Sequence, residues 1–324
     1  STAAAVEKYA KADRRMSVTS DIWDRDPMKL GTPGETVDLR SGDCTHPDPF
    51  DYITRTTSIA PSDGCYPQAW YKFLKDITQG DHDLQCYLQR VFGYCLTGMT
   101  IEHALFFFIG AGGNGKSVFL NVLTEILGTY AVTAAMETFT ATRNEQHSTH
   151  IAMLQGARLV TASETEEGGR WAESRIKSMT GGDPLTARYM RQDFFTFIPQ
   201  FKPIIVGNHS PSLNNVDVAM RRRLHIVPFD FQPKAPDTAL PDKLRAEYPD
   251  ILRWAISGCL EWQEIGLAPP PVVVNATNRY FDAQDLYGTW LSEGWRIEDG
   301  NAHIFHSTKD LFGSWKQFAV ANGE

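Results

Sequence analysis

The sequence predicts an α/β protein whose central sheet is mostly parallel and is flanked by helices. Three observations lead to this fold class. Short apolar runs alternate with helical patterns between residues 104 and 230 of the 324-residue chain. These runs are continuously apolar, which is typical of strands that are buried on both faces. One of them leads through a glycine-rich turn directly into an amphipathic helix.

The composition is that of an ordinary globular protein. Hydrophobic residues make up 42% of the chain and charged residues 22%. No apolar run approaches the ~20 residues needed to cross a bilayer, and the N-terminus lacks a signal-peptide core, so we expect a cytoplasmic protein without a membrane partner. The net charge of −8 argues against a basic surface all round, although it leaves room for a local basic channel.

The length predicts more than one domain, and changes in pattern divide the chain into three parts. Residues 1–98 form an N-terminal helical or collar region, residues 99–235 the α/β core, and residues 236–324 a mostly helical C-terminal segment that could include a winged helix. Helices are expected at 3–15, 70–77, 81–96, 249–266, 274–287 and 308–321, and strands at 36–39, 105–110, 131–136, 158–163, 202–208 and 224–229.

The turn from Gly110 to Ser117 has the spacing GxxxxGKS, which predicts a site for a nucleoside triphosphate. Glycines let successive N–H groups point at phosphate oxygens, and the following helix adds the positive end of its dipole. Lys116 would bridge the β- and γ-phosphates and the Ser117 hydroxyl would hold Mg²⁺. Because the chain lacks an NKxD guanine-reading motif, we expect ATP. The predicted binding set is Gly110, Gly112, Gly113, Asn114, Gly115, Lys116, Ser117 and Val118.

Polar residues follow two of the predicted core strands. Glu164 follows the run 158–163, and we expect it to act as the catalytic base and to share the metal site with Ser117. Glu166 and Glu167 are the alternatives, interpreted as solvated loop acids. Asn208 ends the run 202–208 and could sense the γ-phosphate or position the attacking water, although a turn-forming asparagine is the plainer interpretation.

Three arginines, Arg221 to Arg223, stand directly before the strand at 224–229. A single chain could not easily bring them to its own γ-phosphate, which favours an arginine supplied to a neighbouring subunit. Such a guanidinium is worth ~10³ to 10⁵ in rate where it has been measured. The alternative is a solvated basic helix end.

The segment after Gly181 to Pro184 reads as a β-hairpin, with LTARYM and FFTFIP as its arms and residues 191–193 at its tip. Arg188, Tyr189 and Arg191 would combine charge with stacking, the combination that follows a single-stranded nucleic-acid backbone. A hairpin that packs between subunits is the alternative.

The order of these motifs resembles a known family. GAGGNGKS, RLVTASETEEG, TGGDPLTAR, IIVGNHSP and MRRRLHIVPF are similar, in this order, to the motifs of superfamily 3 helicases of the AAA+ class. More narrowly, the chain resembles the helicase part of phage and plasmid primase-helicases. The upstream LGTPGETVDLRSGD and the downstream NATNRYFDAQDLYGTWL extend the resemblance over most of the chain.

The resemblance implies a hexameric ring that moves 3′ to 5′, with ATP between subunits and hairpins lining a channel for single-stranded DNA. Lys116 and Ser117 then belong to motif A, Glu164 ends motif B, and Asn208 is the motif C sensor. Arg223 is the implied finger, with Arg222 as a close alternative. Ser163 departs from helicases that carry two acids at motif B.

The resemblance also bears on partners and on competing functions. Family members often carry a primase or polymerase domain before the helicase, so such a domain or other replication proteins are expected partners, although no such catalytic region is found here. Two alternatives remain open from the sequence: a protein-remodelling AAA+ ring, and an ATP-dependent DNA-binding assembly or initiator factor.

Overall fold

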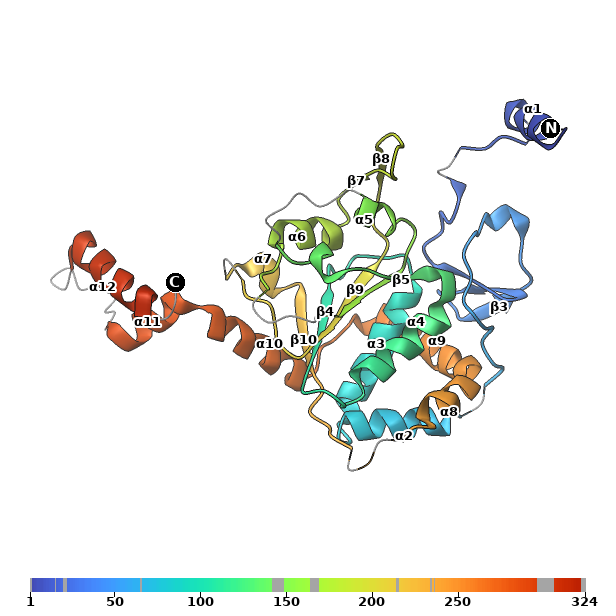
Figure 1. Ribbon diagram of the computed structural model, residues 1–324. Coiled ribbons are helices and arrows are strands. Elements are labelled where there is room, and N and C mark those ends of the chain that lie inside the picture. Colours follow the sequence, from blue (N-terminus) through green and yellow to red (C-terminus); the bar gives the residue numbers. More distant parts are fainter. Residues whose placement is uncertain are drawn as a thin grey trace.

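The computed structural model describes residues 2–14, 16–19, 22–64, 66–141, 149–163, 169–213, 216–233, 235, 237–295 and 306–321. At its centre lies a five-stranded sheet in the order β10-β4-β9-β6-β5, and all four neighbouring pairs are parallel (Figure 1). The predicted α/β class with a parallel sheet is confirmed. Its strands are β4 (Leu105–Ile109), β5 (Ala131–Thr133), β6 (Leu159–Ser163), β9 (Lys202–Gly207) and β10 (Leu224–Pro228).

Strand β4 explains why the core strands are apolar at every position. Phe106 and Phe108 face one hydrophobic core, whereas Leu105 and Phe107 face another, and all four side chains are fully buried. The first core includes residues of α2 (Gln68–Ile77), α3 (His82–Leu96), α4 (Lys116–Leu127) and α9 (Tyr248–Ile265). The second includes residues of α6 (Glu173–Gly181) and α10 (Pro271–Gln284).

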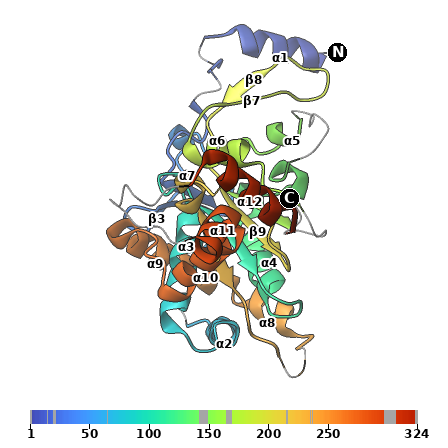
Figure 2. The same ribbon diagram turned by 90° about the vertical axis from the view of Figure 1, so that its left-hand side faces the viewer.

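Smaller elements complete the core region. A short helix, α5 (Thr149–Ala152), precedes β6, and α7 (Val218–Arg221) precedes β10. The predicted hairpin is confirmed as β7 (Leu185–Ala187) paired antiparallel with β8 (Phe195–Phe197). It projects from the body on the side opposite α2 and α8 (Leu240–Ala246), as both views show (Figures 1 and 2).

The N-terminal region contains more strand than the sequence pattern indicates. A three-stranded antiparallel sheet joins β1 (Lys29–Thr32), β2 (Glu35–Asp38) and β3 (Asp43–Thr45), where only the middle strand was expected. Glycine and proline turns hide the flanking strands because they leave only three or four residues in each. Ahead of this sheet, α1 (Thr2–Ala12) buries none of its residues and stands apart from the body (Figure 1).

Helices from before and after the core strands in the sequence pack together in one layer. Helices α3 and α9 cross closely because each presents a glycine at the contact. A Cβ added to Gly93 would lie 2.1 Å from the Cys259 nitrogen, and one added to Gly258 would lie 2.3 Å from the Gln89 oxygen. The Glu247 carboxylate also accepts hydrogen bonds of 2.9 Å from the backbone N–H groups of Ala69 and Trp70, at the start of α2.

Two buried cations join this helical layer to the amino ends of the sheet strands. The Arg158 guanidinium donates to the Leu96 carbonyl at the end of α3 and, over 2.6 Å, to the Lys29 carbonyl of β1. The Lys202 ammonium donates to the Thr97 carbonyl and lies 4.8 Å from the ring centre of Tyr94. Positive charge at a helix C-terminus satisfies carbonyls that the helix leaves without partners.

The C-terminal helices leave the body. Helix α10 ends at Gln284, and the Asp285 carboxylate caps a new helix, α11 (Leu286–Gly294), so the helix expected at 274–287 is broken before its end. Helix α12 (Thr308–Ala321) buries no residue and contacts α11 (Figure 1). The described residues after α10 form these two helices and short connections; the expected winged helix falls partly on residues 296–305, which lie outside the described residues. No described helix is long and apolar enough to cross a membrane.

We predict that Gly93→Ala lowers the free energy of unfolding by about 2–4 kcal/mol, because the added methyl group must push α3 and α9 apart. Gly313→Ala in α12 is the matched control, since nothing lies within 4 Å of the added atom. Removing an exposed helical glycine should stabilise the protein by ~0.5–1 kcal/mol. Urea denaturation of both variants measures the difference. A Gly93→Ala protein as stable as wild type would contradict the close crossing.

Candidate functional site

The turn between β4 and α4 depends on glycine at three of its positions. Gly110, Gly113 and Gly115 have φ angles of 154°, 78° and 90°, which L side chains rarely adopt. A Cβ on Gly110 would also lie 2.2 Å from the Phe229 carbonyl oxygen. The buried Asn114 amide donates to that same carbonyl over 2.5 Å, which ties the turn to the end of β10. The conformation of the predicted cradle therefore requires glycine at these positions and is tied to β10 by the Asn114 side chain.

Lys116 begins α4 and folds back over the turn. Its ammonium donates to the Gly110 carbonyl and lies 3.4 Å from Oδ1 of Asn208. The residue is only 5% exposed, and burial lowers the pKa of its ammonium. Neutral oxygens hold this charge, so an anion that enters the turn would meet a cation that no carboxylate among the described residues neutralises.

The ends of two further strands reach the same place. A cavity of about 390 Å³ is lined by residues 112–118 of the turn and α4, by Ser163 at the end of β6, and by Val206, Gly207 and Asn208 at the end of β9. Strand β9 lies between β4 and β6 in the sheet, which brings Asn208 next to Lys116. The structure thus gathers the predicted cradle and Asn208 around one cavity.

The predicted acid and metal site can be followed only in part. Glu164 lies outside the described residues, as do Glu166 and Glu167, so their roles stay predictions. Ser163, the residue before Glu164, lines the cavity, and so does Ser117. Within the described ranges, no group of three or more His, Cys, Asp and Glu side chains is placed to hold a metal ion. An ion here would need Ser117, Glu164, water and the oxygens of a bound phosphate.

Sequence reasoning missed a second cavity that adjoins the first. It has a volume of about 730 Å³ and shares Gly113, Gly115 and Val118 with the turn. Its apolar wall consists of Ala69, Phe73 and Ile77 on one face of α2, with Phe231 and Leu240 opposite; its polar residues are Lys72, Asp76, Gln232, Asp237 and Lys243. The amphipathic pattern of α2 reads only as packing, and nothing in the sequence connects it to a turn 36 residues later. The size and apolar wall suit a planar heterocycle.

The three consecutive arginines lie in three different environments. Arg221 pairs with Asp282 at 3.2 Å and lies over the Phe281 ring of α10. Arg223 is 7% exposed and donates to the Thr180 hydroxyl at 3.2 Å and to the Ala219 carbonyl at 2.9 Å. Of the three arginines, only the middle one, Arg222, is exposed.

The arginines lie at the amino ends of the sheet strands, whereas the cradle lies at their carboxyl ends. Leu224, the first residue of β10, pairs with Leu105, the first residue of β4, whereas the cradle follows the last residue of β4. The five residues of an extended strand separate these two ends by about 16 Å. The expectation that one chain cannot bring these arginines to its own cradle agrees with this geometry.

The hairpin tip carries both charge and exposed apolar groups. The Arg188 guanidinium lies 4.8 Å from the ring centre of Phe194, and Arg191 sits at the turn with a positive φ of 60°. Tyr189 is held within the chain, because its hydroxyl donates to the Ala152 carbonyl at 3.1 Å and its ring stacks on Phe195. Phe194 is 61% exposed and is therefore the most exposed aromatic ring of the described tip, which the sequence pattern alone does not single out.

The chain is similar in sequence to two family models and to two viral proteins. Residues 1–79 match the D5 N terminal like family, and residues 108–223 match a family of unknown function, DUF5906. Two viral proteins, each named "Putative helicase", are similar: one of Acanthamoeba polyphaga mimivirus is 25% identical over 77% of this chain, and one of Frog virus 3 (isolate Goorha) is 26% identical over 66%. The chain spans 28% and 24% of their lengths.

Solved structures agree on the fold. Two apo structures of the C-terminal region of NrS-1 align with TM-scores of 0.52 and 0.51, at 12% identity, over 88% and 91% of this chain and 69% and 70% of theirs. The sequence matches support the expected resemblance to helicases, and the solved structures show the same fold.

We predict that Lys116→Ala weakens the binding of inorganic tripolyphosphate at least tenfold, about 1.4 kcal/mol or more, because Lys116 carries the one positive charge among the described residues that line the cradle cavity. Isothermal titration calorimetry measures the affinity. Lys75→Ala is the control: it removes an exposed charge from α2 that lines neither cavity, and tripolyphosphate should bind it normally. Equal affinity of wild type and Lys116→Ala would refute the anion site.

Proposed function

We propose that this chain is the motor part of an ATP-driven DNA helicase that works as a ring, with ATP hydrolysed between neighbouring subunits. One observation carries the proposal: the cradle lies at the carboxyl ends of the parallel strands, whereas the exposed Arg222 lies at their amino ends. Each subunit then offers half of a site on each side. The viral relatives named as helicases support the DNA-directed activity.

The cradle residues have distinct roles in this proposal. The loop N–H groups and Lys116 bind the phosphates, and Asn208, close to the Lys116 ammonium, orients the attacking water toward the γ-phosphate. Glu164 removes a proton from that water. Ser117 and Glu164 would hold Mg²⁺, which neutralises phosphate charge when bound. The base of ATP occupies the second cavity, between Phe73 of α2 and the segment that follows β10.

Arg222 is a better candidate than Arg223 for the arginine that acts on the neighbour's nucleotide. Arg223 already makes two hydrogen bonds through its guanidinium within its own chain and is almost fully buried. Withdrawing it would leave the buried Thr180 hydroxyl and Ala219 carbonyl without a donor. Arg222 is exposed and needs no rearrangement to reach a second subunit. We therefore assign the finger to Arg222 and a positioning role to Arg223.

The hairpin is the proposed contact to single-stranded DNA. Arg188 and Arg191 pair with phosphates, and Phe194, with Arg188 above its ring, offers a face for base stacking. Tyr189 supports the tip from below through Phe195. By the family resemblance, the ring is a hexamer that moves 3′ to 5′ in the host cytoplasm and works with a primase or polymerase domain.

One observation favours an alternative function. Met190, Phe194 and Ile198 expose 77%, 61% and 64% of their surface on the hairpin, and an apolar tip of this kind could also grip a polypeptide. A protein-remodelling ring would use these groups without the arginines. An assembly or initiator factor would bind DNA without being driven by it. DNA dependence of hydrolysis separates both from a helicase.

We predict that a thirty-nucleotide oligothymidylate stimulates ATP hydrolysis severalfold, and that Arg191→Ala and Phe194→Ala each raise the DNA concentration needed for half-maximal stimulation at least fivefold. Lys75→Ala, on the exposed face of α2, is the control and should respond as wild type. Phosphate release is measured over a DNA titration at two salt concentrations. Hydrolysis that ignores DNA would favour the remodelling ring.

A further inference from the structure

Helix α6 connects the hairpin to the segment that carries the exposed arginine. The helix ends at Gly181, where Gly182 adopts a left-handed φ of 78°, and β7 begins three residues later at Leu185. In both views α6 lies between the hairpin and α7 (Figures 1 and 2). Arg222 directly follows α7. One helix therefore adjoins both the proposed DNA contact and the proposed finger.

An ion pair ties the start of α7 to α6. The Lys177 ammonium donates to one oxygen of the Asp217 carboxylate. The other oxygen caps α7 and accepts a hydrogen bond of 2.6 Å from the Met220 N–H. Although burial opposes the charge, these two hydrogen bonds lower the pKa of Asp217 overall, so the carboxylate is ionised at neutral pH. Asp217 thus fixes the first turn of α7 to α6.

A second contact ties the end of the same segment to α6. Nε of Arg223 donates to the Thr180 hydroxyl at 3.2 Å, and that hydroxyl donates to the Ile176 carbonyl at 2.7 Å. A Cβ added to Gly181 would lie 3.7 Å from Nη2 of Arg223, so the guanidinium also lies beside the root of the hairpin. Lys177 and Thr180 are three positions apart and therefore share one face of α6.

Arg222 lies between these two points of attachment. It is exposed, whereas Met220 is fully buried in the same hydrophobic core as Ile176 and Met179 of α6. Polar contacts at both ends and apolar contacts between them therefore join the segment 217–223 to α6. Coupling between distant sites travels through such chains of packed side chains and hydrogen bonds.

We propose that α6 carries the effect of DNA binding from the hairpin to Arg222, and that Lys177 and Asp217 are positioning residues for this arginine. The inference rests on the proposed function, because it requires a hairpin that binds DNA and an arginine that acts on the neighbour's nucleotide. DNA at the tip shifts α6, and the ion pair passes the shift to α7. The Arg222 guanidinium then meets the neighbour's γ-phosphate in the geometry that stabilises its transfer.

The test compares ATP hydrolysis with and without a thirty-nucleotide oligothymidylate. Lys177→Met and Asp217→Asn each remove the ion pair, and the asparagine keeps an oxygen that caps α7. The pair is partly exposed, so its loss should leave the fold intact, which urea denaturation checks. We expect the DNA-stimulated kcat to fall at least fivefold in each variant. Lys177→Arg should restore it.

Two other constants distinguish a misplaced arginine from a general defect. KM for ATP and the DNA concentration for half-maximal stimulation should stay within twofold of wild type, because neither the cradle nor the hairpin tip is changed. A higher DNA requirement with an unchanged stimulated kcat would overturn the inference, since the pair would then shape the hairpin and not the arginine.

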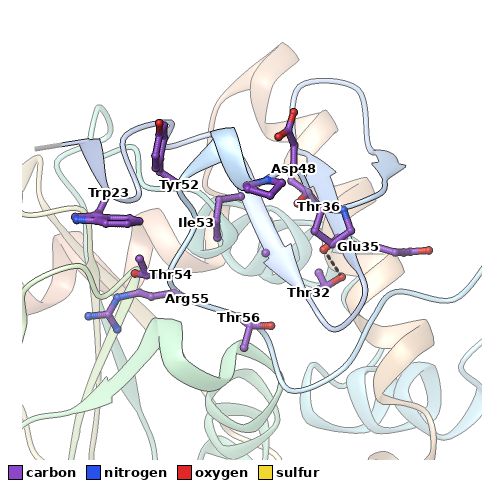
Figure 3. A pocket seen from close by; sticks show the side chains of 13 residues that line it. Trp23, Thr32, Glu35, Thr36, Asp48, Tyr52, Ile53, Thr54, Arg55 and Thr56 are labelled. Carbon is purple, nitrogen blue, oxygen red and sulfur yellow. Dashed lines mark hydrogen bonds between the residues drawn. The ribbon is translucent and has the colours of Figure 1, made fainter. Parts of the chain in front are cut away.

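Lys29→Met is the matched control. Lys29 of β1 pairs with Asp51 of the segment 47–56, and its side chain is 31% exposed, against 30% for Lys177. This segment, β1 and β2 enclose an N-terminal cavity of about 370 Å³, to which α6, α7 and the hairpin contribute no lining residue (Figure 3). The control loses a comparable ion pair far from the proposed link and should keep its full stimulation by DNA.

Mixed subunits show on which side of the shared site the defect lies. Lys177→Met mixed with Lys116→Ala should regain stimulated hydrolysis, because the Lys116→Ala subunits supply a well-placed arginine to intact cradles. Lys177→Met mixed with Arg222→Ala should regain none, since neither protein supplies such an arginine. Recovery in the second mixture would overturn the inference.

The remaining outcomes separate this inference from the proposed function. Full stimulation of Lys177→Met and Asp217→Asn by DNA would overturn the link through α6 and leave the proposed helicase intact. A wild-type protein whose hydrolysis ignores DNA would overturn both.

Discussion

Parallel pairing in the central sheet is the constraint from which the proposed mechanism follows. Because β4 and β10 run in the same direction, the turn that follows β4 and the arginines that precede β10 lie at opposite ends of these two strands. No side-chain rotation closes a gap of about 16 Å. The same pairing brings Asn208 beside Lys116, since the end of β9 lies next to the end of β4. Parallel pairing therefore brings Lys116 and Asn208 together within one chain, and it leaves the arginine to be supplied by a second subunit.

The helical layer on one face of the sheet holds the cradle in place. At its far end, α4 presents Glu125, whose carboxylate accepts a hydrogen bond of 2.8 Å from the Tyr248 hydroxyl and pairs with Arg245 at 3.3 Å. The Glu247 carboxylate holds the start of α2, which forms a wall of the second cavity. Segments from both ends of the chain thus meet around the proposed base site, and a bound nucleotide would contact both.

The sequence was a good guide wherever a local pattern determines the structure. The five core strands, the glycine turn and the hairpin all follow from apolar runs and turn residues, and each is confirmed. The partners and the burial of the three arginines could not be predicted, because they depend on Thr180 of α6 and Asp282 of α10. The second cavity was missed for the same reason: its walls come from residues 69–77 and 231–243. The hydrogen bond of the Tyr189 hydroxyl could not be predicted either, because its acceptor, the Ala152 carbonyl, lies 37 residues earlier.

The most direct test of a site shared between subunits is ATP hydrolysis by mixed variants. Lys116→Ala and Arg222→Ala proteins are assayed alone and after mixing, with co-assembly confirmed by mass. In an equal mixture about a quarter of the interfaces combine an intact lysine with an intact arginine, so the mixture should regain hydrolysis that neither variant has alone. A mixture that co-assembles and stays as inactive as its parts would contradict the account.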